Sequence, residues 1–403
     1  MDKKFIRNLF LGLAVVSILM SGAYKLGQKS VKAEIEEEGK LDLSQMWKVK
    51  SRLEELYLDA DKMDEEKMTY GAIQGMVAAL GDPYTVFLPP SDNKAANEDL
   101  AGEFGGVGIQ LGYKDKTLSV MAPLAKTPAE EAGIKAGDLI LKIIDKEKEV
   151  DKDTAGISLD EAVSLIRGPV GSKVTLKLYR EGKSEAFEVE LKRDNIVVAS
   201  LEMEWVEREG KKIAWVKLYK FTDRLFTEWP EMVDKIRSEK DDSYGGLVLD
   251  VRNNPGGFLQ ASVLVASDFL KEGLVVKQES LKGKTEVYEV DKKRGYLLED
   301  KMVVLVNGGS ASASEILAGA LKDYDRAKLV GEKTFGKGTV QQPENFADGS
   351  GIHVTIARWL LPKGNNIHNE GVNPDVEVIY EVDEENPEKD NQLEKAIEVL
   401  LEK

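Results

Sequence analysis

Ser312 is the first residue whose type and surroundings could support nucleophilic chemistry. It lies in VVLVNGGSASASEILAGALKDY (303–324), where a buried strand runs into small residues and then into a predicted helix. Free N–H groups and the dipole at a helix start favour negative charge, which an attacking serine oxygen and its oxyanion both require. An ordinary role is also open, because Ser312 and Glu315 match a capping box that would only begin the helix.

Lys337 is the second such residue, in the stretch GEKTFGKGTVQQ (331–342). The glycines on either side permit close backbone approach. A lysine held in an apolar setting loses its proton more easily, because burial disfavours the charged ammonium. Lys337 could therefore serve as a general base, and the ordinary alternative is a surface lysine in a glycine-rich turn.

The same stretch resembles a phosphate-binding loop, but it lacks two features that such a loop needs. Gly331 and Gly336-Lys337 have the right spacing, yet Gly338 stands where a magnesium-binding Ser or Thr is required. The residues that follow, TVQQP, are β-branched and end in proline, so they do not open a helix. Nucleotide binding is therefore not expected.

Histidine and cysteine chemistry is limited by composition. The chain has two histidines, His353 and His368, and no cysteine, so disulfides, thiolate metal sites and three-histidine zinc sites are excluded. No G-x-S-x-G elbow surrounds Ser310 or Ser312, and neither histidine has an obvious carboxylate companion. A histidine-based triad is not expected.

A third stretch, LVLDVRNNPGGFL (247–259), could supply an oxyanion donor. It is a buried strand that ends in a Pro-Gly-Gly turn. Sites in open α/β sheets gather beyond the carboxyl ends of strands, where such a turn can direct a backbone N–H at an oxyanion. An ordinary loop is the alternative, because these dipeptides mark turns anywhere.

The elements around these stretches indicate an α/β protein. Strands and helices alternate over 196–380, which predicts a mostly parallel, buried sheet. Residues 103–193 form a compact β-rich module whose helix, SLDEAVSLI, has Ser158 as its N-cap. Helical spacing also appears over 43–58, from Asp64 to about 80, and over the tail 390–403.

Length and charge set further limits. The 403 residues suggest two or three domains, and the net charge of −16 argues against a nucleic-acid partner. Near the N-terminus, three basic residues precede the uncharged run NLFLGLAVVSILMSGAY (8–24). This predicts a signal anchor, with a cleaved signal peptide or a buried helix as alternatives. The globular part is then expected outside the cytoplasm.

Taken together, the stretches resemble the C-terminal processing (tail-specific) serine protease family with a PDZ domain. The matches follow the family's order over roughly residues 43–380 and include the stretches above. The additional matching segments are GDPYTVFL (81–88), EFGGVGIQL (103–111), AGIKAGDLILKI (132–143), LIRGPVGSKV (165–174) and GVNPDV (371–376).

The resemblance implies a Clp peptidase–crotonase-like protease core with an inserted β-rich PDZ domain and helical N- and C-terminal segments. It assigns the nucleophile to Ser312, the general base to Lys337 and the lysine-orienting role to Gln341. It places the oxyanion hole at the N–H groups of Ala313 and of either Gly256 or Gly257. Asp323 matches a family position for which a structural role is expected.

In the PDZ-like module, the resemblance implies that Gly105, Gly106, Val107 and Gly108 capture a C-terminal carboxylate, with the peptide tail added as a strand. Arg167 matches an arginine that couples peptide occupancy to the active site, although it could equally be a surface residue. The implied substrates are proteins or peptides with apolar C-termini, cut in the tail region. An adaptor and a homodimer are possible partners, and no metal or organic cofactor is implied.

An active serine-type endopeptidase is the favoured hypothesis, and a catalytically silent PDZ scaffold and a crotonase-like enzyme acting on thioesters are the alternatives.

These inferences divide the chain into six expected regions. The regions are a signal anchor or signal peptide (1–27), a linker (28–40), an N-terminal helical and cap region (41–100), the PDZ domain (101–193), the protease core (194–382) and a C-terminal helix (383–403).

Overall fold

The computed structural model describes residues 42–402, apart from 115, 125, 281–282, 382–385 and 387–388. The predicted signal anchor at 1–27 and linker at 28–40 lie outside these residues. Within the described residues, no helix has the length and apolar character that crossing a bilayer requires.

The chain divides into two compact units, Met1–Ala72 and Ile73–Lys403. The first contains α2 (Ser44–Leu56) and the short 3-10 helix η1 (Ala60–Lys62), and α3 (Glu65–Ala78) begins in it. The Asp64 side chain accepts the N–H of Lys67 at 3.0 Å, so the predicted N-cap is confirmed. The apolar stripe of α2 stays exposed, and Trp47 is 60% exposed.

The second unit is built on a six-stranded sheet in the order β10-β11-β12-β15-β16-β19. All neighbours pair in parallel except β10 and β11, which confirms the predicted mostly parallel sheet. The central strands β12 and β15 are nearly continuous buried runs, as expected where both faces of a sheet are covered. The strands are β10 (Leu201–Arg208), β11 (Lys211–Leu218), β12 (Tyr244–Asp250), β15 (Met302–Val306), β16 (Lys328–Gly331) and β19 (Val376–Glu377).

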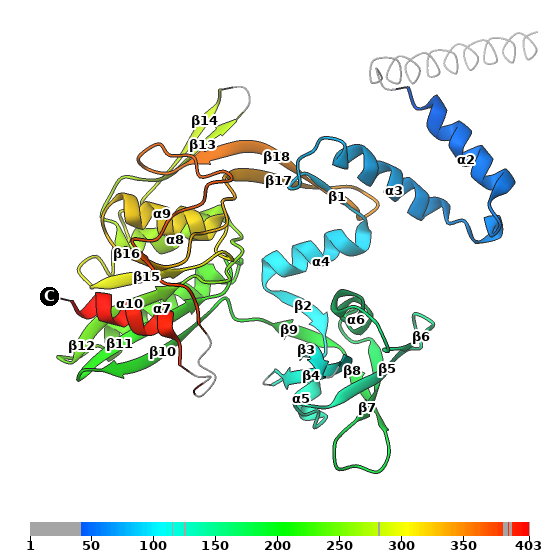
Figure 1. Cartoon of the computed structure of the whole chain (residues 1–403), viewed down its shortest axis with the longest axis horizontal. Helices are drawn as coiled ribbons and strands as arrows, with labels where there is room; N and C mark the ends of the chain where they lie inside the picture. The colour runs from blue at the N-terminus through cyan, green and yellow to red at the C-terminus, as the bar shows by residue number, and fades with distance from the viewer. Residues whose placement is uncertain are drawn as a thin grey trace, which may run out of the picture. The chain divides into compact units, whose positions relative to one another are not determined.

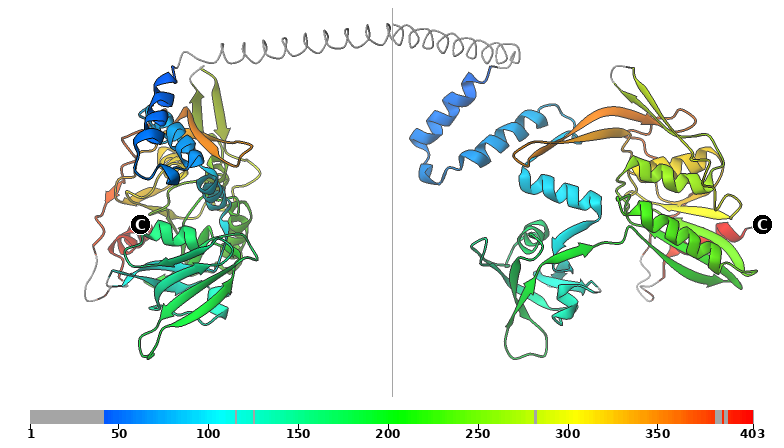
Figure 2. Two further views of the ribbon diagram at one scale, coloured as in Figure 1. Left: turned by 90° about the vertical axis from the view of Figure 1, so that its right-hand side faces the viewer. Right: turned by 180° about the vertical axis from the view of Figure 1, so that it is seen from behind.

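Helices cover both faces of this sheet (Figures 1 and 2). One face packs against α7 (Leu225–Glu239), α8 (Leu259–Phe269) and α9 (Ala313–Asp323) in the largest apolar core. The other face packs against α10 (Asn391–Leu401), the predicted terminal helix. The apolar stripe of α10 is therefore buried within its own chain, through residues such as Leu393 and Ile397.

A second sheet carries the lysine segment and was not predicted from the sequence. It has the order β1-β18-β13-β14, with β17 also paired to β18. Here β1, which precedes α4 (Pro90–Ala101), pairs with β18 so that Val86 is opposite His353. The strands are β1 (Val86–Leu88), β13 (Leu274–Ser280), β14 (Thr285–Glu289), β17 (Thr339–Asn345) and β18 (Gly351–Leu360).

The predicted β-rich module has its own apolar core. Its sheet has the order β3-β4-β5-β7-β8, so β3 is an edge strand, and β2 pairs separately with β9. The Ser158 side chain accepts the N–H of Glu161 at 3.2 Å, which confirms the predicted N-cap. The elements are β2 (Glu103–Gly106), β3 (Ile109–Lys114), β4 (Thr117–Pro123), α5 (Pro128–Glu131), β5 (Leu139–Asp145), β6 (Val150–Asp153), α6 (Leu159–Ile166), β7 (Lys173–Tyr179), β8 (Phe187–Lys192) and β9 (Asp194–Val197).

Candidate active site

Ser312 occupies a strained turn between β15 and α9. It is the residue before the first turn of α9, with φ of 55° and ψ of −114°, a backbone conformation that non-glycine residues rarely adopt. Strain of this kind costs of order 1–3 kcal/mol and persists only where the surroundings enforce it. Ser310, two residues earlier, is fully buried and donates its hydroxyl to the Val251 carbonyl at 2.7 Å. Of these two serines, only Ser312 is partly exposed to solvent.

The Glu315 carboxylate connects the serine turn with the lysine segment. It is fully buried on α9 and accepts the Ser312 N–H at 2.9 Å, so the glutamate does bond back to the start of the helix. It also accepts the Thr334 hydroxyl at 2.6 Å and the N–H groups of Gly336 and Lys337 at 2.7 and 2.9 Å. Sequence reasoning identified this residue only as a capping partner.

Lys337 lies in the loop two residues before β17 and is partly buried. Burial lowers the pKa of its ammonium below the ordinary value for lysine, and the carboxylates of Asp82 and Glu315 partly oppose this. Its Nζ lies 5.1 Å from the ring centroid of Tyr84. Burial, and then the charge of Lys337, also lowers the pKa of His353, a residue of β18. Burial outweighs the two carboxylates, so this lysine gives up its proton more readily than one in water.

Gln341 lies on β17, four residues beyond Lys337. Its side-chain amide donates to the hydroxyls of Thr339 at 3.0 Å and Thr355 at 3.1 Å. These two threonines come from the paired strands β17 and β18. The structure thus anchors the Gln341 side chain to β17, the strand that follows Lys337, and to its neighbour β18.

The Pro-Gly-Gly turn after β12 packs directly against the serine turn. A Cβ added to Gly256 would lie 2.8 Å from Ser312 Cβ and 2.9 Å from the Ala313 nitrogen. The Gly256 N–H donates to the Asn254 side chain at 2.9 Å. By contrast, the Gly257 and Ala313 N–H groups have no hydrogen-bond partner within the described parts of the chain.

Asn254 holds the two turns together. Its backbone carbonyl accepts the Ala311 N–H at 3.0 Å and the Ser314 hydroxyl at 2.9 Å. Its side-chain amide donates to the Leu218 carbonyl at 2.6 Å. The sequence offered only an Asn-Asn-Pro turn signal for this fully buried residue.

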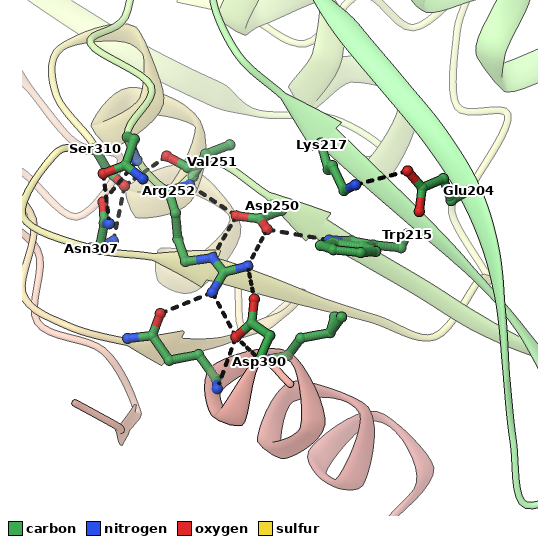
Figure 3. A network of polar contacts seen from close by, with 12 residues as sticks. Glu204, Trp215, Lys217, Asp250, Val251, Arg252, Asn307, Ser310 and Asp390 are labelled. Atoms are coloured by element: carbon green, nitrogen blue, oxygen red, sulfur yellow. Dashed lines mark hydrogen bonds and ion pairs between the residues drawn. The ribbon is translucent and has the colours of Figure 1, made fainter. Parts of the chain in front are cut away.

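Arg252 fixes the start of the loop that follows β12 by bonding residues at the start of α10 (Figure 3). Its guanidinium bonds the carboxylates of Asp250 at 2.6 and 2.9 Å and of Asp390 at 2.7 and 3.0 Å, and also Gln392 at 3.0 Å. The Trp215 indole N–H donates to Asp250 at 3.2 Å. Burial would lower the pKa of Arg252, but these two carboxylates outweigh burial and raise it. The strand end is therefore fastened to the start of α10.

Of the residues predicted to bind a chain end, Gly105 and Gly106 lie in β2, where they pair with β9, and only Val107 and Gly108 lie in the turn between β2 and β3. Val107 is buried and Gly108 has φ of 76°. Their carbonyls accept the N–H groups of Ala129 and Leu124, both at 2.9 Å, which fixes the turn. Because β3 is an edge strand, it can accept an added strand.

Arg167 is the C-cap of α6. Its guanidinium carbon lies 3.7 Å from the ring centroid of Phe104, and burial lowers its pKa. Its carbonyl accepts the ammonium of Lys148 at 3.0 Å. The structure therefore places this arginine against an aromatic ring of the same module rather than at the surface alone.

Asp323, at the end of α9, accepts the Lys363 N–H at 2.9 Å.

Comparison with known proteins gives matches along the chain. The profile described as peptidase family S41 matches residues 212–378, and that of the PDZ domain matches 105–191. The profile described as the activating protease CtpB N-terminal domain matches residues 12–91. The carboxyl-terminal-processing protease of Synechocystis sp. is 37% identical over 377 residues, which cover 89% of this chain and 85% of that protein.

A second relative and one solved structure agree with this. The carboxy-terminal processing protease CtpA of Bacillus subtilis is 36% identical over 316 residues, 78% of this chain, and the match spans 65% of that relative's length. A solved structure from Bacteroides fragilis, assigned to the S41 proteases, has a TM-score of 0.54 at 17% identity. It covers 90% of this chain and 98% of its own, a likeness of fold. On these matches, the chain belongs to peptidase family S41, among the carboxyl-terminal-processing proteases that contain a PDZ domain.

Proposed function

We propose that this protein is a serine endopeptidase that cleaves proteins near their C-termini, with Ser312 as nucleophile and Lys337 as general base. The observation that supports this best is the buried Glu315 carboxylate, which accepts N–H groups from both residues. A single rigid acceptor thus fixes the backbone of Ser312 and Lys337 close to each other. Ser312 lies at the start of α9, where the helix dipole favours an oxyanion.

In the proposed mechanism, neutral Lys337 removes the proton of the Ser312 hydroxyl as the serine oxygen attacks the scissile carbonyl. The carbonyl oxygen becomes an oxyanion, and the ammonium then passes its proton to the leaving amine. Water hydrolyses the acyl-enzyme in a second, equivalent cycle. Lowering of the lysine pKa by burial supports this role, because a base must be neutral to accept a proton.

The proposed oxyanion donors are the N–H groups of Ala313 and Gly257. Both lack hydrogen-bond partners among the residues that the structure describes, whereas the Gly256 N–H is already bonded to Asn254. Gly256 instead provides the close approach to Ser312 that only a glycine allows. We assign Gln341 the role of orienting the lysine segment, through its anchor on Thr339 and Thr355.

Substrate selection is proposed to lie in the PDZ domain. The segment Gly105, Gly106, Val107 and Gly108, at the end of β2 and in the turn that follows, would take the C-terminal carboxylate, and the substrate tail would pair with the edge strand β3. Arg167, stacked on Phe104, is proposed to transmit occupancy of this groove to the protease core. The names of the relatives, which describe processing of carboxyl termini, support this substrate class.

An extracytoplasmic location, with anchoring of the protein to the membrane by its N-terminal segment, is part of the same proposal. The basic residues and the uncharged run at 8–24 support it. N-terminal sequencing of the mature protein tests the anchor, because a start near residue 30 would indicate a cleaved signal peptide instead.

The test of the proposed activity uses an unstructured protein substrate with an apolar C-terminus. Wild type should shorten its tail, and Ser312→Ala and Lys337→Ala should each show no detectable cleavage. The same substrate with an amidated C-terminus should be cut more slowly, because the carboxylate is lost. Retained cleavage in Lys337→Ala would reject the base assignment. A wild type that binds the tail without cutting it would support the silent PDZ scaffold.

A further inference from the structure

We propose that Tyr84 is a positioning residue for Lys337, an inference that rests on the proposed role of this lysine as general base. Tyr84 belongs to the turn before β1, far from the lysine in sequence. The centroid of its ring lies 5.1 Å from the Lys337 Nζ. An aromatic face within about 6 Å of an ammonium attracts it through the ring quadrupole.

The turn that carries Tyr84 is rigidly held. Asp82 accepts the Tyr84 N–H at 3.0 Å and the Thr85 hydroxyl at 2.7 Å, which closes the turn on itself. The Thr85 hydroxyl in turn accepts the Thr355 N–H of β18 at 3.0 Å. Thr355 is also the residue to which the Gln341 amide donates. The tyrosine and the glutamine are thus fixed to one residue of the sheet that presents the lysine.

An aromatic ring suits this position better than a carboxylate would. The charged groups that face Lys337 are Asp82 from the turn, Glu315 from α9 and the titratable His353 from β18. No carboxylate in the described residues makes an ion pair with the lysine. A direct ion pair would hold the ammonium charged and oppose its action as a base. The ring attracts the ammonium more weakly than a carboxylate in direct contact would, and in the proposed role it also covers the amine, whose burial lowers its pKa.

The test compares the pH dependence of tail cleavage in Tyr84→Phe and Tyr84→Ala with wild type. Phenylalanine keeps the ring and should retain most of the activity. Alanine should lower kcat roughly tenfold or more at neutral pH, since misplaced catalytic groups cost up to about 10²-fold, with KM little changed. Because water then reaches the amine, the acidic limb of kcat/KM should move to higher pH, and alkaline pH should restore part of the activity.

Tyr296→Ala is the matched control, because Tyr296 is a partly exposed tyrosine that contacts the cations Arg237 and Arg294 instead. It should leave the pH profile unmoved. An unmoved profile in Tyr84→Ala, or a loss in Tyr84→Phe equal to that in Tyr84→Ala, would overturn the positioning role of the ring.

A second measurement does not depend on activity. In a Ser312→Ala background, the pH midpoint for trace acetylation of the Lys337 amine by acetic anhydride can be followed by mass spectrometry. Tyr84→Ala should raise this midpoint and Tyr84→Phe should not, and equal midpoints would reject the proposal. If wild type proves inactive as a protease, the proposed peptidase function is rejected. The midpoint still shows whether the Tyr84 ring affects the protonation of the Lys337 amine.

Discussion

The Glu315 carboxylate accepts the backbone N–H of Lys337 at 2.9 Å, although 22 positions separate the two residues in sequence. The same carboxylate accepts the N–H of Ser312. Four hydrogen-bond donors satisfy this buried carboxylate, so the Glu315 side chain is held firmly in one position. The distance between the serine turn and the lysine segment is therefore set by one side chain that itself takes no part in the proposed bond making.

Replacing Glu315 with glutamine should disrupt this arrangement. The amide offers one acceptor oxygen where the carboxylate has two, and its NH₂ would face N–H donors. We expect kcat for tail cleavage to fall at least roughly tenfold, from misplacement of the catalytic groups. The free energy of unfolding should fall by about 1–3 kcal/mol for a donor left unsatisfied. Denaturant unfolding and cleavage kinetics measure both, and Glu344→Gln, on an exposed part of β17, is the control that should change neither.

Replacing Gly256 with alanine should slow catalysis strongly. The new Cβ would lie 2.8 Å from Ser312 Cβ, and the φ of 98° at this position is strained for any side chain. We expect kcat to fall by about 10²-fold, as the serine moves away from its productive position. Gly210→Ala is matched, because Gly210 also has a positive φ of 72° but nothing within 4 Å of the added Cβ. If Gly256→Ala cleaves as fast as Gly210→Ala, the close packing of the two turns is not needed for activity.

Replacing Lys337 with methionine should make the protein more stable while it abolishes cleavage. Burial lowers the folded-state pKa of the lysine, so below that pKa the folded state carries a charge whose burial is unfavourable. As pH rises from the lowered pKa to the ordinary pKa of lysine, the unfolded state binds more protons and wild type gains stability. The advantage of Lys337→Met in Tm should therefore be largest near neutral pH and shrink toward alkaline pH. An advantage that stays constant with pH would contradict the burial argument.

Removing the Arg252 guanidinium should destabilise both the loop after β12, which contains Gly256 and Gly257, and the terminal helix α10. Arg252→Met leaves Asp250 and Asp390 without their cation, and breaking a buried pair in this way typically costs about 3–5 kcal/mol. Thermal unfolding and cleavage rates should both report the loss. Glu398→Gln, which breaks an exposed pair with Lys395 on the same helix, should cost less than about 1 kcal/mol.

The same ion pair gives a pH dependence whose sign can be worked out. Burial would raise the pKa of Asp390, but the hydrogen bond from Arg252, the backbone N–H of Leu393 and the charge of Arg252 together outweigh burial and lower it. A lowered folded-state pKa stabilises the protein above the ordinary pKa of aspartate, and this stabilisation is lost as pH falls through the lowered value. Wild type should therefore lose more stability between neutral pH and about pH 3 than Asp390→Asn does, as measured by Tm. Parallel curves would contradict this prediction.

The sequence by itself determined the elements and the main candidates of the site. Strand and helix alternation predicted the parallel sheet. The caps at Asp64 and Ser158 could also be predicted, because capping depends on neighbouring residues, and the structure confirms both. The family resemblance and the residue types together identified Ser312 and Lys337 as the candidate catalytic pair. Local patterns reveal such features because hydrophobic periodicity and capping act over a few residues.

Only the tertiary structure decided what surrounds that pair. The second sheet joins β1 to β18 across more than 260 residues, and this pairing brings Tyr84 against Lys337. The bonds of Glu315 to Thr334, Gly336 and Lys337 and the attachment of Arg252 to Asp390 likewise join segments remote in sequence. No local pattern encodes these contacts, because their free energy depends on burial and on partners that meet only when the chain folds.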